Sequence, residues 1–442
     1  MKSSTKSVET QSDFSKEVQP ENIKIMSKLE DVIGLSPEVL ERTAFSCKAL
    51  VRKREIKQAT DLLRIVFAYV VFDWSMRYLG LWCVLLGIGS LSDVAVRKRL
   101  QACNKWLGKL IALLLRAGQI NIQPKAGVRL RLQDATVISK PGSTGTDFRI
   151  HLSLNMSAAA IDGINLTDQH TGETLAHFPT QAEDIRIGDR GYAYASSLGP
   201  VLADGRLVVR NNWQNLPLKT VDGKSLCYKD WLSVIAEASE CKVTLETPNG
   251  TFLLRAIACP LPPEKAEEAR RRARAAAMKK KHTVRDETLL AAGFVLVVTN
   301  LPVEEFDTMT VLSFYRIRWQ IELLFKRLKS LLALDGLRSK DERLGQTYLL
   351  GKMLVALLID RGMQQVRFQA PDWFTRLDRP ASLWRLTILF LDCFRDLVRG
   401  TINWEQYMEK LSVLERYFCS SPRKRTNQLA NARALLANLA GC

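Results

Sequence analysis

The sequence predicts a mixed α/β protein in which a run of strands lies between two helical regions. Three observations lead to this fold class. Residues 36–118 repeat apolar side chains at helical spacing, residues 127–212 alternate them with a period of two, and the chain beyond residue 300 returns to helical spacing. A period near 3.6 indicates an amphipathic helix, and a period of two indicates a half-buried strand. A chain of 442 residues has room for roughly two to four domains.

The charge of the chain indicates a polyanionic partner. It carries 64 Lys and Arg against 46 Asp and Glu, a formal charge of +18, which favours nucleic acid or an anionic membrane surface. Membrane insertion is not expected, because the most apolar runs, 65–72 and 78–89, are too short to span a bilayer. The opening residues lack the apolar core of a secretory signal. Nine scattered cysteines without a C-x-x-C pair indicate neither disulfides nor zinc, so we expect a cytoplasmic protein.

The N-terminal region reads as a tail followed by helices. Residues 1–35 are polar and weakly patterned, which is typical of a flexible tail. Ser92 is placed to cap a helix that follows the turn at residues 87–89. A helix-turn-helix reader of DNA is one interpretation, with Arg97 and Lys98 on its polar side. A solvated basic face is the other interpretation.

Residues 127–212 read as a meander followed by a β–α–β unit. We expect a hairpin over residues 160–178, with its turn near Thr171 and Gly172. A strand, a helical stretch and the apolar strand at 206–210 then complete the unit.

Residues 213–300 read as a separate element. The alternating runs on either side of Asn249-Gly250 predict a hairpin. A long charged helix is expected from Pro263 to His282, before an apolar strand at 294–299. That helix can lie on DNA, because its basic residues outnumber its acids, or it can be a solvated spacer.

Two of the expected strands end their apolar face with an acid. Asp134 has the parity of Leu132, and Asp189 has that of Ile187. An isolated buried carboxylate destabilises the fold by several kcal/mol unless it is paired, protonated or bound to a metal. Taken singly, each acid can also be explained as a turn residue or a helix cap.

A third acid lies in the stretch YRIRWQIELLFKRLK, which reads as one amphipathic helix. At about 100° per residue, Tyr315, Arg318, Glu322 and Lys329 fall within a wedge of about 60°, opposite the apolar side. Three carboxylates without a histidine form a hard-oxygen set that suits Mg²⁺ or Mn²⁺. A pair of such ions can activate the attacking and leaving oxygens of a phosphoryl transfer.

The basic residues of this stripe have two interpretations. Beside a metal site, Arg318 and Lys329 can grip phosphates and Tyr315 can donate to a phosphate or stack. Without such a site, the stripe can be a solvated face that the pair Arg318–Glu322 stabilises.

The spacing Y-x2-R-x3-E-x6-K resembles the helix motif of DDE transposases from bacterial insertion sequences, in insertion sequence family four. DATVISKP (134–141) resembles the first-aspartate segment of that family, and GDRGYA (188–193) resembles the second. The run LVVR that ends at Arg210 resembles the strand that follows. Position 135 is Ala where Gly is frequent in the family. The resemblance covers about residues 90–370.

The resemblance implies a ribonuclease-H-like catalytic core with a β-rich insertion, flanked by N-terminal and C-terminal helical regions. Asp134, Asp189 and Glu322 would be the catalytic residues and the metal ligands, holding two Mg²⁺ ions with Mn²⁺ as a substitute. The implied reaction cleaves DNA at the transposon ends and joins the freed 3′-hydroxyl to target DNA. Contacts with DNA are expected from Tyr315, Arg318, Lys329, Arg210, Trp319, Arg97 and Lys98.

The implied partners are double-stranded DNA, as terminal inverted repeats and as target, and a second copy of the chain in a homodimer on DNA. The protein would then be associated with the nucleoid. Some relatives form a DNA hairpin, for which an aromatic residue holds a flipped base; the candidates here are Trp213, Trp231 and Trp319. Two rival functions are a metal-dependent nuclease without strand transfer and an inactive DNA-binding derivative.

The expected domains follow from these assignments. They are a tail (1–35), a helical DNA-binding domain (36–120), the first part of the core (121–212), the insertion with its basic helix (213–300), the core helix with Glu322 (301–345) and a C-terminal helical region (346–442).

Overall fold

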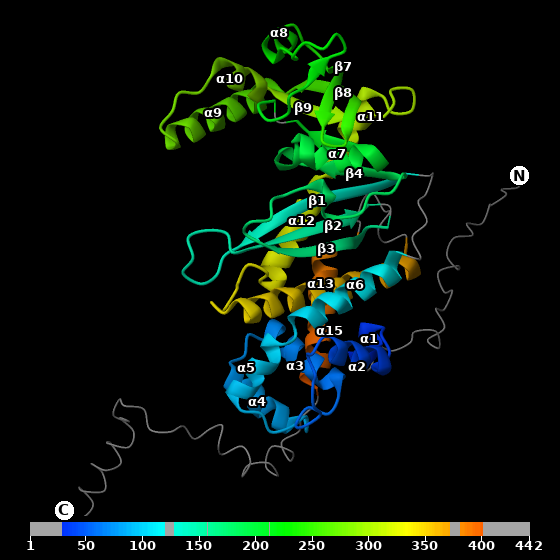
Figure 1. Ribbon diagram of the computed structural model, residues 1–442, viewed down its shortest axis with the longest axis vertical. Coiled ribbons are helices and arrows are strands. Elements are labelled where there is room, and N and C mark those ends of the chain that lie inside the picture. Colours follow the sequence, from blue (N-terminus) through cyan, green and yellow to red (C-terminus); the bar gives the residue numbers. More distant parts are fainter. Residues whose placement is uncertain (1–28, 120–127, 157, 212, 372–380, 401–442) are drawn as a thin grey trace, which may run out of the picture.

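The computed structural model describes residues 29–119, 128–156, 158–211, 213–371 and 381–400. The molecule is elongated (Figure 1), with helices at one end and a sheet that runs from the middle to the other end. Among the helices in these ranges, none is long and apolar enough to cross a membrane.

Helices form the N-terminal end of the described chain, as the sequence predicted. Ser36, Ser75 and Ser92 each begin a helix, and each side-chain oxygen accepts a hydrogen bond from the backbone N–H three residues later. Such a cap satisfies a donor that the first helical turn leaves free. The helices are α1 (Leu29–Ile33), α2 (Pro37–Ser46), α3 (Ala59–Val71), α4 (Met76–Leu85), α5 (Asp93–Gln101) and α6 (Asn104–Gln119).

Part of the expected flexible tail is helical instead. The expectation for residues 1–28 lies outside the described residues, but α1 occupies 29–33. Leu29 and Ile33 are both buried in the main apolar core. Their four-residue spacing puts them on one face of a helix, and this burial holds a segment whose composition is otherwise polar.

A nine-stranded sheet organises the rest of the described chain, in the order β3-β2-β1-β4-β5-β9-β8-β7-β6. Its strands are β1 (Arg129–Ile138), β2 (Phe148–Asn155), β3 (Ala160–Asp168), β4 (Asp184–Gly188), β5 (Arg206–Arg210), β6 (Lys219–Thr220), β7 (Ser239–Thr247), β8 (Gly250–Pro260) and β9 (Phe294–Thr299).

The half of the sheet from β3 to β5 has a mixed topology. β1 pairs antiparallel with β2 and parallel with β4, and β4 pairs parallel with β5. Helix α7 (Ala195–Asp204) is the crossover that a parallel β4–β5 pair requires. Because the carboxyl ends of parallel strands meet at one edge of a sheet, Asp134 late in β1 and Asp189 after β4 lie toward the same edge.

The hairpin expected over residues 160–178 is wrong. β3 pairs with β2 instead, and the chain does not return as a strand after Asp168. The Asp168 carboxylate accepts hydrogen bonds from the backbone N–H groups of His170 and Thr171, which closes a turn. The segment then crosses the sheet as a short 3-10 helix, Leu175–His177, with Leu175 buried.

Strands β7 and β8 form the expected hairpin at Asn249-Gly250. The region does not separate from the core, however, because β9 pairs with both β5 and β8 and so joins the two halves into one sheet. The apolar strand β9 therefore lies inside the sheet, with a hydrogen-bonded strand along each of its two edges. The division into domains stays a prediction. The helices of this region are α8 (Tyr228–Ser233), α9 (Pro263–Lys279) and α10 (Asp286–Ala292).

The single helix expected around residues 315–329 is wrong, because the structure breaks it at Arg318. Helix α11 (Thr308–Ile317) packs against β4, β5 and β9, whereas α12 (Trp319–Leu332) packs against β1 and two other helices. Tyr315 is consequently buried on α11 and does not share an exposed stripe with Glu322.

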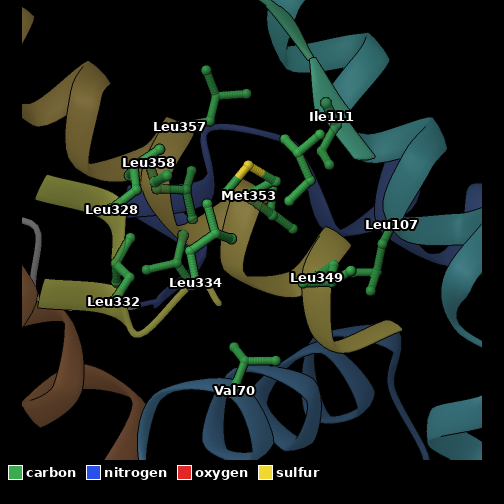
Figure 2. Close-up of a cluster of buried hydrophobic side chains, with 14 of the residues drawn as sticks. Val70, Leu107, Ile111, Leu328, Leu332, Leu334, Leu349, Met353, Leu357 and Leu358 are labelled. Atoms are coloured by element: carbon green, nitrogen blue, oxygen red, sulfur yellow. The ribbon is translucent and has the colours of Figure 1, made fainter. Parts of the chain in front are cut away.

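Helix α13 (Glu342–Gln369) is the centre of the helical end, and α15 (Leu383–Arg399) packs beside it. Figure 2 shows Leu349, Met353 and Leu357 of α13 among side chains from α3, α6 and α12. Leu328 and Leu332 of α12 are buried in this cluster. Burying each side chain stabilises the fold by about 1.5–3 kcal/mol. This burial turns that side of α12 toward the helical core and away from the sheet edge. The expected C-terminal helices beyond residue 400 lie outside the described residues.

Candidate active site

Asp134 projects from β1 on the face that the alternating pattern predicted. Leu132, two residues earlier, is fully buried on that face. The Asp134 carboxylate accepts a hydrogen bond from the Ala135 N–H at 2.8 Å. Burial raises the pKa of Asp134 to about 6, and the charges of Asp189 and Glu173 act in the same direction. Burial destabilises the charged form of this carboxyl, and a cation beside it would stabilise that form.

Asp189 follows β4, where the buried strand ends. It occupies the N-cap position of the 3-10 helix Arg190–Tyr192, but its side chain makes no cap hydrogen bond. The helix-cap explanation of this acid is therefore wrong. Instead, the Tyr315 hydroxyl donates to Asp189 Oδ1 at 3.3 Å, and Arg318 Nη1 lies 3.9 Å from Oδ2.

Glu322 lies in the first turn of α12 and is paired with Arg318. The distance from Arg318 Nη1 to Glu322 Oε1 is 2.6 Å. Burial acts to lower the pKa of Arg318, but Tyr315, Asp189 and Glu322 outweigh it and raise that pKa. The guanidinium also lies over the Tyr315 ring, 5.6 Å from its centroid, within the range of a cation–π contact. Arg318 thus holds the second and third acids together.

A cavity of about 430 Å³ opens between β1 and α12. Asp134 and Glu322 both line it, so the first and third acids face one space. Lys329 lines the same cavity, two turns along α12 from Glu322. The full lining is Asp134, Ala135, Thr136, Glu322, Phe325, Lys326, Lys329 and Ser330.

The three acids fit a divalent cation by their chemistry. Carboxylate oxygens are the donors that hard cations prefer, and the raised pKa of Asp134 indicates a carboxyl without enough positive charge beside it. In the described part of the chain, however, no three Asp, Glu, His or Cys side chains form a group that could hold a metal ion as they stand. Arg318 supplies the positive charge between Asp189 and Glu322 in this conformation.

The other residues that we expected to contact DNA differ in their location relative to this site. Arg210 ends β5 and interacts with the Tyr315 side chain. Trp319 begins α12 and is 57% exposed, beside Arg318. A second apolar core lies around strands β5, β7, β8 and β9 and includes Leu207, Leu245 and Leu254. Trp213 and Trp231, the other aromatic candidates, pack against this second apolar core instead.

Helix α5 and the loop before it give the expected helix–turn–helix outline, with Gly87 and Gly89 at positive φ between α4 and α5. Arg97 is 3.5 Å from Asp341, the N-cap residue of α13. Lys98 is exposed. Arg97 therefore ties α5 to α13 in this conformation, and its contact with DNA stays a prediction.

Two residues near the acids were not among the predicted site residues. Glu173 is a fourth carboxylate near the site, paired with Arg149 at 3.7 Å, and its charge raises the pKa of both Asp134 and Tyr192. Tyr192 is buried, and burial is the main cause that raises its pKa. Glu173 lies in the segment where the sequence predicted a hairpin strand. Its position near the acids follows only from the observed path of that segment.

The chain matches a known family over almost half of its length. Residues 153–359 match the family described as "Transposase DDE domain". That range includes Asp189 and Glu322 and ends in α13.

Individual relatives match over a longer part of the chain. The InsL protein of insertion sequence element IS186A from Escherichia coli strain K12 is 37% identical over 333 residues, 73% of this chain and 90% of that protein. The transposase of insertion sequence element IS421 from Escherichia coli is 37% identical over 334 residues, with the same shares. Among solved structures, a piggyBac transposase synaptic complex with hairpin DNA matches with a TM-score of 0.41 and 9% identity, covering 90% of this chain and 84% of that one.

Proposed function

Because this chain belongs to the DDE transposases of bacterial insertion sequences, enzymes that cleave DNA and transfer its strands, we propose that it moves its element by cut-and-paste transposition. In this proposal the enzyme binds the terminal inverted repeats, cleaves both ends of the element and joins the 3′-hydroxyl ends to target DNA. One observation carries the proposal. Arg318 pairs with Glu322 and lies near Asp189, and Asp134 lines one cavity with Glu322.

The half of the sheet from β3 to β5 supports the proposal of a ribonuclease-H-like core. An antiparallel meander leads into two parallel strands, and the acids lie on the central strand and at the end of its parallel neighbour. The β-rich region between β5 and α11 would then be an insertion that brings the third acid back to the same edge. Its strand β9 hydrogen-bonds to β5, which keeps α11 and α12 in position.

DDE transposase domains generally use divalent metal ions. Asp134, Asp189 and Glu322 would hold two Mg²⁺ ions, with Mn²⁺ as a substitute. Such ions polarise the scissile phosphate and make a bound water or a 3′-hydroxyl a better nucleophile. Arg318 competes with a cation for Glu322 Oε1, and the phosphate of the DNA is the anion that Arg318 would contact once a cation takes that oxygen.

The protein's own side chains would position the DNA strand. Lys329 lies on the cavity wall with two of the acids and can bind a phosphate there. Tyr315, held against Asp189, keeps that acid oriented toward the site. Trp319 exposes its ring at the start of α12 and can stack on a base next to the cleaved bond. A homodimer would bring two such sites to the two ends of the element.

The proposal is tested with a linear DNA that carries the inverted repeats of the element inside flanking sequence. Purified protein and Mg²⁺ should release the element with double-strand breaks at both ends, and a pre-cleaved end with a 3′-hydroxyl should be joined to a plasmid. A nuclease that cuts but does not join would give released ends and no joined product. Nicking of one strand with copying of the element would contradict the cut-and-paste route.

A further inference from the structure

Helix α9 has six Lys and Arg residues, more than any other described helix or strand, and its basic residues fall into two parts. In the first part, Glu267 and Glu268 each form ion pairs with two basic neighbours. The ion pairs are Lys265–Glu268, Arg270–Glu267 and Arg274–Glu267, at 3.0–3.6 Å, and Arg272–Glu268.

The second part of the helix has no such compensation. Lys279, Lys280 and Lys281 are exposed, and no carboxylate of the described chain lies within ion-pair distance of their ammonium groups. Arg271 and Arg285, on the helix and just after it, are also exposed and unpaired within the described residues. Four uncompensated cations are thus presented on and around the end of α9, and Arg271 lies about two turns before that end.

This helix end is held in a fixed place by the rest of the region. Arg270 Nε donates to the Leu289 carbonyl of α10 at 3.3 Å, and Ala266 and Ala277 are buried against the neighbouring elements. Helices α9 and α10 pack along each other. A solvated spacer would not need this anchoring. Because the anchored helix is already ordered, binding to a partner does not require a flexible chain to lose conformational entropy.

The backbone at the helix end holds a lysine in the left-handed conformation, which disfavours side chains. Lys281 has φ 56°, and the His282 N–H bonds to the Ala277 carbonyl while the Lys281 N–H bonds to the Met278 carbonyl. This is the helix-ending motif that usually carries glycine at the left-handed position. A lysine there is less stable than glycine by about 1 kcal/mol, and such local strain is typical of positions that are kept for function.

The charged end lies on the same side of the molecule as the edge that holds the acids. In Figure 1, α9 and the connection between β1 and β2, which leaves the carboxyl end of β1, both project to the left. A duplex held at the acids would have to continue outward on this side to reach the end of α9.

We propose that Lys279, Lys280 and Lys281, with Arg271 and Arg285, bind the phosphate backbone of duplex DNA beyond the segment held at the three acids. The contact is independent of base sequence, because contacts with phosphates position a duplex without reading its bases. It lengthens the DNA footprint of the enzyme in one direction. The inference relies on the proposed function only for the position of the acids.

The test compares two double variants of the full chain with equal loss of charge. Lys279→Gln with Lys280→Gln removes two uncompensated cations, and Arg272→Gln with Arg274→Gln removes two ion-paired ones. Lys281 is left in place because its positive φ would mix a backbone effect into the result. Fluorescence anisotropy gives the Kd for a short duplex around the cleavage site and for one extended on each side in turn, across a salt series.

We expect the lysine pair to weaken binding of one extended duplex by roughly tenfold and to lower its salt slope by about 1.8, which is two phosphate contacts. Binding of the short duplex and cleavage of it should be unchanged. The arginine pair should change the slope much less. Equal losses in both double variants would indicate a general field effect and would overturn the proposal, as would an unchanged slope for the lysine pair. If the unmodified protein did not cleave the DNA, that result would instead contradict the proposed function.

Discussion

Arg318 Nη1 lies 2.6 Å from Glu322 Oε1, so the guanidinium is bound to one of the acids that is proposed to hold metal. The same nitrogen is 3.9 Å from Asp189 Oδ2. A cation cannot bind both carboxylates at full strength while the arginine neutralises them. Binding of metal and release of Arg318 are therefore coupled, and a phosphate that takes up Arg318 favours metal binding.

Arg318→Gln should raise the affinity of the DNA-free protein for Mn²⁺ by roughly tenfold, the equivalent of about 1.4 kcal/mol. Without the guanidinium, the carboxylates lose the positive charge that competes with the ion. Isothermal titration calorimetry measures the affinity directly. Arg316→Gln is the matched control, because Arg316 is exposed on α11 and no carboxylate is paired with it among the described residues. Equal or weaker Mn²⁺ binding by the Arg318 variant would show that the two cations do not compete.

Replacement of an acid should stop catalysis without loss of DNA binding. We expect Asp134→Asn, Asp189→Asn and Glu322→Gln each to lower the rate of end cleavage by at least about 10³-fold, because each removes a charged metal ligand. The Kd for the uncleaved end, measured in Ca²⁺ or without metal, should change by less than about threefold. Glu305→Gln changes an exposed acid of the same type. A variant of the trio that still cleaves at near the normal rate would remove that residue from the assignment.

The sequence predicted most of the strands and the relative order of the acids, because alternation and helical spacing are local. Asp134 was placed on the face of Leu132 by parity alone, and β1 confirms it. The hairpin at Asn249-Gly250 was likewise found from a two-residue turn signal. Features of this kind depend on a few neighbouring residues and do not need the rest of the fold.

The errors came from tertiary packing. The break at Arg318 is not visible in the periodicity of residues 315–329, since it arises when α11 packs on β5 and α12 packs on β1. Similarly, the pairing of β9 with both β5 and β8 joins a region that composition set apart. The ion pair of Arg97 with Asp341 links residues that are far apart in the chain, so no local pattern could find it.

Asp360 should make the stability of the protein depend on pH. Burial raises its pKa to about 6, although it accepts a hydrogen bond from the Ile161 N–H at 3.0 Å. A carboxyl whose pKa is higher in the folded than in the unfolded state binds more protons when folded. Its favourable contribution is therefore complete below about pH 4 and is lost as the pH rises through about 6.

Asp360→Asn keeps an oxygen for the Ile161 N–H and removes this titration. We expect the variant to be more stable than the unmodified protein by about 1–3 kcal/mol at pH 7.5, with the difference shrinking as the pH falls to 4. Urea unfolding at several pH values measures the difference, and other titrating groups cancel in it. A difference that stays constant with pH would mean that Asp360 does not titrate in this range.

Arg255 should stabilise the junction between the hairpin β7–β8 and helix α11. It is buried on β8, pairs with Glu240 and donates through Nη1 to the carbonyls of Leu301 and Phe306. Arg255→Ala leaves these acceptors without a donor, so we expect the free energy of unfolding to fall by about 3–5 kcal/mol. Lys219→Ala removes an exposed pair with Glu246 and should cost less than about 1 kcal/mol. Urea unfolding compares the two, and similar losses would contradict a special role for Arg255.

Trp319 should report on DNA binding because its ring is the exposed one of the three aromatic candidates. It is 57% exposed beside Arg318, whereas Trp213 is packed against the second apolar core. A base that stacks on an exposed indole quenches its fluorescence and contributes about 1–3 kcal/mol. We expect Trp319→Phe to abolish most of the quenching that an end duplex causes, and Trp319→Ala to weaken end binding by roughly tenfold. Trp213→Phe is the matched control and should leave both the quenching and the Kd unchanged. Quenching that survives in the Trp319 variant but disappears in the Trp213 variant would place the base beside Trp213, between β5 and β6, instead.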